Sequence, residues 1–248
     1  MQYAQSKIKT REGLPILPGS LPILGHLLRT TEDIPVMLEG AVRELGPQFW
    51  MKMSEWVLMC TGQDAFDLLK NKTTTSEHYN DLVADFIGAS LLGVDGSPHR
   101  RMRGAMNGSF TPKGITATGA ATTSAEVIED RLSRLDPSSV VIHDETQTIA
   151  LHIIFRVLDI PAADLGAWTT KYQQFLLTIF PIRVDLPFTP VRRGKEAGYW
   201  LDDRFRSMFA AAAKAPELVG TVGALLGSKD DEGKGLEERE LIDNLKLL

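Results

Sequence analysis

From residue 97 onward, the chain carries a succession of segments in which apolar residues recur with the period of an α-helix. The clearest begins near residue 144, where the apolar positions follow the i, i+3, i+4, i+7 spacing of a buried stripe: Ile149, Ala150, Ile153, Ile154, Val157 and Leu158. A stripe of this kind has to be covered by other helices or by a sheet. This feature therefore predicts a mostly α fold.

The same spacing and the positions of proline predict where the helices lie. We expect helices from residue 97, over 115–135, from about residue 144, and over 163–180, 192–214, 217–226 and 236–248. Gly119 is a weak point of the second helix, because glycine disfavours a helix interior. The last helix reaches residue 248 without a capping glycine or proline, so we expect the chain to be cut in mid-helix.

The first part of the chain predicts a small β element. Residues 1–30 are rich in proline and glycine and predict an extended arm over the surface of the fold. Residues 34–45 have helical spacing, and residues 49–60, FWMKMSEWVLMC, indicate two short strands joined by a turn. After a short helix at 64–69, residues 73–96 predict a long loop with one short helix. Long loops in compact domains are often functional.

Composition excludes several classes of protein. The chain is 43% hydrophobic and 24% charged, with a formal net charge of −5, whereas a nucleic-acid-binding protein needs a basic face. Its one cysteine, Cys60, permits neither an internal disulfide nor a thiolate metal cluster. The start of the chain lacks the apolar core of a signal peptide, and no apolar run approaches the ~20 residues that a bilayer requires. We therefore expect a soluble, cytoplasmic protein.

Two basic side chains early in the helix that begins at residue 97 are candidates for chemistry. His99 and Arg103 are four residues apart and therefore share a helix face, and Arg100 and Arg101 add positive charge. The N-terminus of a helix favours an anion. A solvated basic face that pairs with surface acids is the alternative interpretation. Residue types and spacing alone leave both open.

Residues 91–110, LLGVDGSPHRRMRGAMNGSF, resemble the heme-propionate helix of the cytochrome P450 family. That family's pattern is L-L-x-x-D-G-x-x-H-x-x-x-R followed by a phenylalanine. Its places are filled in order by Leu91, Leu92, Asp95, Gly96, His99, Arg103 and Phe110. The proline-rich start PGSLPILGHL, the connection DLPFTPVRRGKEA and the segment EERELIDNLKLL are similar to further parts of the family in the same order. The resemblance covers nearly the whole chain.

The resemblance implies a fold and an activity. The fold would be P450-like, mostly α with a small β-sheet, and residues 1–248 would be the N-terminal part of one domain, truncated before the central helix and the heme-ligand loop. Within it, the arm would cover 1–30, the helix and sheet region 31–72, and the loop and helical region 73–248. The implied activity is that of a heme-thiolate monooxygenase, which hydroxylates or epoxidises a lipophilic small molecule using O2 and electrons from a ferredoxin- or flavodoxin-type partner. Arg100 and Arg101 would be exposed charges that face an acidic partner.

The resemblance also implies roles for single residues. His99 and Arg103 would donate hydrogen bonds to the heme propionates. Leu91 and Leu92 would end the loop over the heme, and Phe110 would pack near the edge of the macrocycle. Six further residues would lie in regions that line the substrate pocket: Tyr79, Phe86, Ile87, Phe175, Leu176 and Ile179. Ordinary core positions are the alternative for each of the six. Their apolar character points to a fatty acid, a terpenoid or a steroid.

The sequence departs from the family at the iron ligand. The family's ligand loop reads F-x-x-G-x-x-x-C-x-G, whereas Cys60 is preceded by Trp56 where the glycine belongs and by Met53 where the phenylalanine belongs. Cys60 is therefore expected to be a buried, inert thiol, and the iron ligand to lie outside this sequence. No catalytic residue or metal ligand is assigned, and acidic pairs such as Asp202-Asp203 are interpreted as solvated helix charges.

Two alternatives to the monooxygenase remain open. The first is a truncated P450 homologue without the thiolate ligand, which acts as a ligand-binding or interaction module. The second is an unrelated α-helical protein whose basic helix resembles the propionate motif by chance.

Overall fold

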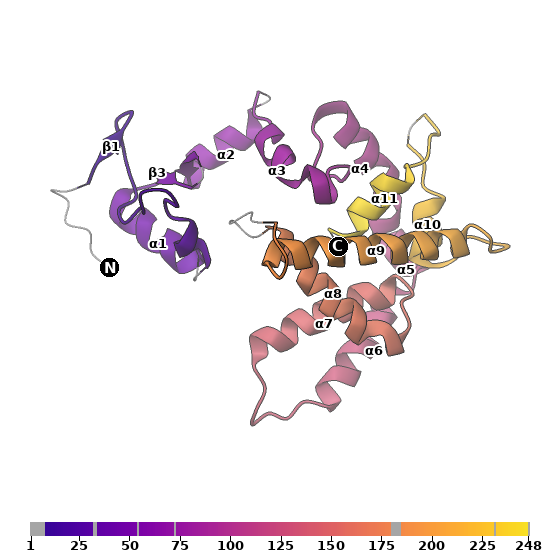
Figure 1. Cartoon of the computed structure of the whole chain (residues 1–248). Coiled ribbons are helices and arrows are strands. Elements are labelled where there is room, and N and C mark those ends of the chain that lie inside the picture. The colour runs from indigo at the N-terminus through magenta and orange to yellow at the C-terminus, as the bar shows by residue number, and fades with distance from the viewer. Residues whose placement is uncertain are drawn as a thin grey trace. The chain divides into compact units, whose positions relative to one another are not determined.

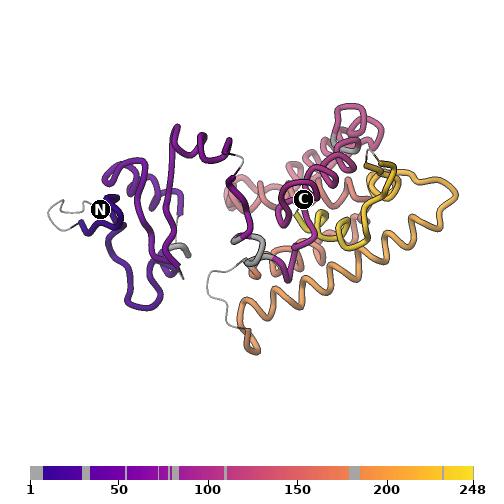
Figure 2. The backbone as a smooth tube through the Cα atoms, turned by 90° about the horizontal axis from the view of Figure 1, so that it is seen from above, coloured from indigo at the N-terminus to yellow at the C-terminus, as the bar shows by residue number. Residues whose placement is uncertain are grey.

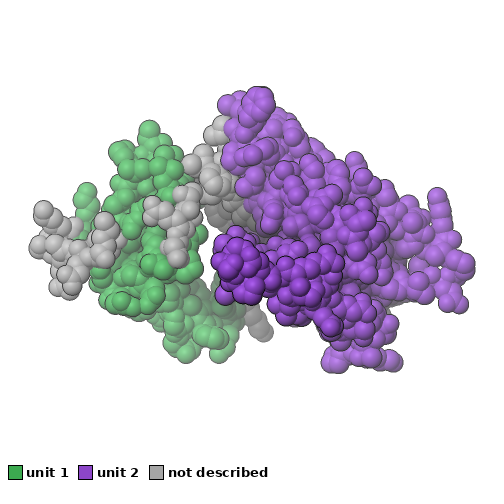
Figure 3. Space-filling model, turned by 90° about the horizontal axis from the view of Figure 1, so that it is seen from below, with its two compact units in different colours: residues 1–75 green, residues 76–248 purple. Residues whose placement is uncertain are grey.

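A computed structural model of the chain describes residues 8–31, 34–53, 55–71, 73–179, 185–230 and 232–247. The chain divides into two compact units, Met1–Thr75 and Ser76–Leu248 (Figure 3). In the described residues, the first unit contains two small two-stranded sheets, and helices form the second unit. This confirms the predicted mostly α fold with a small β-sheet. Within the described ranges, no helix has the length and apolar character needed to cross a bilayer.

In its described residues, the first unit contains two α-helices, one 3-10 helix and two antiparallel strand pairs. Its elements are β1 (Thr10–Arg11), β2 (Leu14–Pro15), the 3-10 helix η2 (Leu27–Thr31), α1 (Ile34–Leu45), β3 (Gln48–Lys52), β4 (Trp56–Cys60) and α2 (Gly62–Lys70). β1 pairs with β2 and β3 with β4, both antiparallel. The buried core consists of Leu17, Ala41, Phe49 and Met51. The predicted helix at 34–45 and the two strands within 49–60 are confirmed.

The prediction of a surface arm over residues 1–30 is only partly right, because two described residues of this segment are fully buried. Leu17 packs into the core, and the ring of His26 lies against backbone groups. Its Nδ1 accepts a hydrogen bond from the Lys52 amide at 3.2 Å, and its Nε2 is 3.3 Å from the carbonyl of Pro18. Gly25 has a φ of +56°, and a Cβ there would be 2.2 Å from the Lys52 carbonyl oxygen. The arm is therefore integrated into the first unit.

The second unit is entirely helical in its regular structure as described (Figures 1 and 2). Its elements are α3 (Glu77–Ile87), α4 (Gly96–Phe110), α5 (Pro112–Ala117), α6 (Ala120–Ser133), α7 (Ile142–Val157), η3 (Ala162–Asp164), α8 (Leu165–Phe175), η4 (Leu176–Ile179), α9 (Pro190–Ala212), α10 (Gly220–Leu226) and α11 (Glu238–Leu245). The long loop expected over 73–96 contains an eleven-residue helix, α3. The single helix expected over 115–135 is two helices separated at Gly119, and the helix expected to reach residue 248 ends at Leu245.

Helix α9 is the centre of the second unit. It contacts α8, η4, α10 and α11, and it is the long orange helix of Figures 1 and 2. Thr189 caps it by accepting a hydrogen bond from the Arg192 amide, and Pro190 occupies the first turn. Its buried side includes Leu201 and Phe205, whose ring meets Trp168 of α8 edge-on at 5.2 Å. Both α8 and α11 pack against α9, and Tyr172 of α8 donates a 3.0 Å hydrogen bond to the Lys246 carbonyl at the end of α11.

Candidate functional site

The start of α4 is tied to the start of α3 by one carboxylate. Asp95 precedes α4 in an extended conformation, and Gly96 follows with a φ of +64°. The Asp95 carboxylate accepts hydrogen bonds from the amide and the hydroxyl of Ser76, both at 2.7 Å. These bonds, with a smaller contribution from the charge of His99, lower the pKa of Asp95. The Asp95 side chain therefore holds the two ends of the 76–95 segment together.

His99 and Arg103 lie together on one flank of α4. The helix buries Met102, Ala105 and Met106. Because successive residues are rotated by about 100°, His99 and Arg103 fall beside each other at the edge of this buried stripe. His99 is half-buried and Arg103 is exposed. Within the described part of the chain, the Arg103 guanidinium has no hydrogen bond or ion pair. This flank can therefore offer donors to an anion.

Arg101 lies on the opposite flank of α4 and has a different role. Its guanidinium forms a hydrogen-bonded ion pair with Glu240 of α11, and its side chain is largely buried. The prediction that Arg101 is an exposed charge for a partner protein is therefore wrong. Arg100 is exposed, as predicted.

Two of the three apolar residues expected along a heme have described side chains, and these lie in different surroundings. Leu91 is half-buried against the core, and its amide donates a 3.0 Å hydrogen bond to Oδ1 of Asn244. Leu92 is 50% exposed. Phe110 is the last residue of α4, and its side chain lies outside the described part of the structure.

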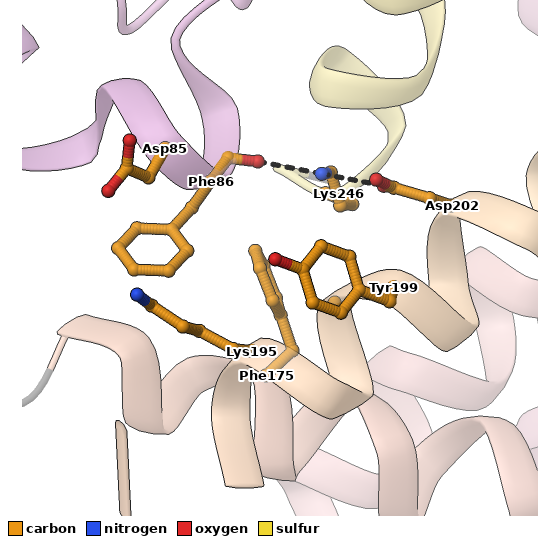
Figure 4. A pocket seen from close by; sticks show the side chains of 8 residues that line it. Asp85, Phe86, Phe175, Lys195, Tyr199, Asp202 and Lys246 are labelled. Atoms are coloured by element: carbon orange, nitrogen blue, oxygen red, sulfur yellow. Dashed lines mark hydrogen bonds and ion pairs between the residues drawn. The ribbon is translucent and has the colours of Figure 1, made fainter. Parts of the chain in front are cut away.

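A cavity of about 270 Å³ opens between α3, α8, α9 and the end of α11 (Figure 4). It is lined by Asp85, Phe86, Phe175, Lys195, Gly198, Tyr199, Asp202 and Lys246. Two of the six predicted substrate residues, Phe86 and Phe175, meet here, and Figure 4 shows both rings bordering the space. The cavity therefore joins two segments that are about 90 residues apart in the sequence.

Three of the other four predicted substrate residues, Tyr79, Ile87 and Leu176, are not among the described residues that line this cavity. Tyr79 is exposed on α3, and Ile87 is buried in the core of the second unit. Leu176 is 44% exposed, and the side chain of Ile179 lies outside the described residues.

Charged groups in the cavity wall were missed from the sequence. Asp202 was interpreted as solvated, but it is buried and forms an ion pair with Lys246 at 2.8 Å. Lys195 forms an ion pair with Asp185 at 2.9 Å, which lowers the pKa of that carboxyl. A signal for Asp202 existed: it stands four residues after Gly198 and three before Phe205, on the buried side of α9. The cavity combines aromatic rings with paired charges.

Cys60 ends β4 and is half-buried, where a buried thiol was expected. It belongs to the first unit and lies opposite Gln48 in the sheet. A cysteine that ends a paired hairpin strand does not have the setting of a ligand loop.

No protein-family profile matches the chain. The chain is 34% identical over 243 residues to cytochrome P450 BJ-4 of Bradyrhizobium diazoefficiens, and 32% identical over 243 residues to the homolog of that protein in Sinorhizobium fredii. Each alignment covers 97% of this chain and 54% of the relative. The chain belongs to the cytochrome P450 family. It spans about half the length of these curated P450 relatives.

A solved P450 structure has the same fold over the part that this chain covers. The retinoic acid-bound cyanobacterial CYP120A1 superposes with a TM-score of 0.76 at 20% identity, over 95% of this chain and 56% of that one. Human cytochrome P450 26B1 is 30% identical over 125 residues, which cover 47% of this chain. The fold is that of a P450, so the alternative of an unrelated α-helical protein is excluded. The cofactor that these relatives imply is heme.

Proposed function

We propose that the protein is a heme-thiolate monooxygenase in which these 248 residues supply the propionate anchors and part of the substrate pocket. The observation that carries the proposal is the flank of α4 on which His99 and Arg103 lie. Arg103 has no intramolecular partner among the described residues, whereas Arg101, two positions earlier, is paired with Glu240. A charged side chain without a partner in the described residues is available to donate to an external anion.

The residues of this flank suit the edge of a heme, which carries two carboxylates. In the proposal, Arg103 and His99 each donate to a propionate and so orient the macrocycle, while Leu91, Leu92 and Phe110 offer apolar contact. When bound, heme supplies the activation of O2, and the protein supplies orientation and exclusion of water. The proposal assigns the thiolate to a cysteine outside this sequence.

For the substrate, we propose a lipophilic small molecule of the size of a fatty acid, terpenoid or steroid. Phe86 and Phe175 border the cavity and would pack against its apolar body. The structurally similar CYP120A1 was solved with retinoic acid bound, which is a lipophilic acid. Electrons would come from a ferredoxin- or flavodoxin-type protein, to which exposed Arg100 offers a positive charge.

The propionate assignment is tested with Arg103→Ala in the full-length protein. Removing a charge-assisted hydrogen bond should weaken hemin binding by roughly tenfold or more. Hemin titration and the heme content after gel filtration measure the loss. Arg100→Ala is the matched control, because Arg100 is an exposed arginine of the same helix with no partner in the described residues. Equal heme loss in the two variants would contradict the assignment.

The same preparation decides between the monooxygenase and the non-catalytic homologue. A full-length protein that binds hemin and, when reduced under CO, gives the red-shifted Soret band of thiolate-ligated heme supports the enzyme. A full-length protein that lacks this band is the non-catalytic module.

A further inference from the structure

Polar side chains of α11 and of its C-cap residue, Lys246, meet the last turn of α3 and the irregular backbone that leads from it to α4. Three hydrogen bonds connect them: Lys246 Nζ donates to the Phe86 carbonyl at 2.6 Å, the Ala89 amide donates to Asp243 Oδ2 at 3.0 Å, and the Leu91 amide donates to Asn244 Oδ1 at 3.0 Å. Phe86 lines the cavity, and Ala89 and Leu91 lie in the segment that leads from Phe86 toward α4. Side chains of a distant helix thus supply partners that regular secondary structure would otherwise supply.

Lys246 is buried and contacts three oxygen atoms of the protein. Its side chain is 2% exposed. Besides the Phe86 carbonyl, its ammonium is 2.8 Å from Oδ1 of Asp202 and 3.0 Å from Oδ1 of Asp243. Figure 4 shows the contacts with Phe86 and Asp202. Only the contact with the Phe86 carbonyl has the geometry of a hydrogen bond, whereas the Oδ1 atoms of Asp202 and Asp243 are ion-pair contacts without hydrogen-bond geometry. The hydrogen bond of the buried Lys246 ammonium is therefore directed at the backbone of α3.

The charges around Lys246 balance. Arg239 is 3.2 Å from Asp202 Oδ2 and 2.9 Å from Asp243 Oδ2, so two cations face two carboxylates. Burying such a cluster costs desolvation free energy, and well-packed apolar residues are often as stabilising. What an ionic cluster adds is direction, because each bond requires a particular atom at a particular place. The cluster specifies two backbone atoms outside it, the carbonyl oxygen of Phe86 and the amide nitrogen of Ala89.

We infer that Lys246 is a positioning residue that fixes Phe86, and with it one wall of the cavity, relative to α9 and α11. Phe86 precedes the last residue of α3, and the next bonds, at Ala89 and Leu91, continue the attachment toward α4. Asn244 also meets α4, because its Nδ2 is 3.0 Å from the sulfur of Met102. That this wall contacts a substrate rests on the proposed function, but the attachment itself does not.

The test is hydrogen–deuterium exchange in the full-length protein carrying Lys246→Met with Asp202→Asn. This pair removes one cation and one anion and leaves Arg239 opposite Asp243, so the buried charge stays balanced. We expect the amides of residues 88–93 to exchange about tenfold faster, as expected for the loss of a charged hydrogen bond. The amides of α8 and α9 should keep their rates.

The control is Lys234→Met with Asp203→Asn, which makes the same changes at exposed positions and should leave exchange at 88–93 unaltered. Unchanged exchange at 88–93 in the Lys246 variant would overturn the inference. So would acceleration by the same factor in α8 and α9, since Lys246 would then contribute only to overall stability. Exchange is recorded before and after hemin is added, so the result does not depend on whether the protein binds heme.

Discussion

Asp95 is the residue on which the approach to α4 depends most directly. Its carboxylate accepts two bonds from Ser76, and these favour the charged form. Because its pKa is lowered in the folded protein, the stabilisation is complete above the pKa of the unfolded chain and is lost as the pH falls through the lowered folded value. Closure of the 76–95 segment should therefore persist at neutral pH and fail in acid.

We expect the amide chemical shift of Ser76 to titrate with a midpoint below the ordinary aspartate value of 3.8. An NMR titration of the wild type measures this midpoint. In Asp95→Asn the acid transition at Ser76 should disappear, because the amide side chain does not titrate. A wild-type midpoint at or above 3.8 would contradict the assigned cause.

Arg101 and Asp202 show which properties of single residues the sequence could not predict. Spacing alone placed His99 and Arg103 on one flank of α4, because that relation is local. The partner of Arg101 is Glu240, which is 139 positions away, and the partners of Asp202 are Lys246 and Arg239. Whether a charged side chain is solvated or paired depends on which distant element packs beside it. No local pattern contains that information.

Among the elements, the boundary between α5 and α6 differs from the prediction. The sequence predicts one helix over 115–135 with a weak point at Gly119. It adopts a φ of +69° and separates two helices. Left-handed backbone is costly for a residue with a Cβ, so the glycine marks a boundary. The starts of α5 and α9 have a clearer local signal. Each helix begins at a proline, Pro112 or Pro190, and the hydroxyl of the preceding threonine accepts a capping hydrogen bond.

Gly119→Ala should destabilise the protein by about 1 kcal/mol, because alanine resists the left-handed conformation. Urea unfolding followed by circular dichroism measures the change. Gly108→Ala should change the free energy of unfolding in the opposite direction, because Gly108 lies within α4 and a Cβ there meets no atom within 4 Å. It should stabilise by roughly 0.5–1 kcal/mol. Equal effects at the two glycines would show that backbone conformation does not decide the outcome.

At the scale of the whole molecule, the sequence predicted the kinds of elements well and their arrangement only through the family resemblance. Each long segment with a predicted apolar stripe is helical in the structure, because helical periodicity is a local property of the sequence. The cavity, in contrast, joins residues of α3, α8, α9 and α11, and half of its lining residues are charged. The sequence predicts an apolar pocket, because the charged residues of the lining are recognisable only once these distant elements pack together.

The buried cluster around Lys246 leads to a prediction for the stability of the second unit. Lys246→Met alone leaves one more buried carboxylate than there are cations, and breaking a buried pair in this way should cost about 3–5 kcal/mol. Adding Asp202→Asn removes the excess anion and should recover most of that loss. Denaturant unfolding of the two variants measures the difference. If the double variant is as unstable as the single one, charge balance is not what the cluster requires, and the hydrogen bond to the Phe86 carbonyl would carry the stability as well as the position.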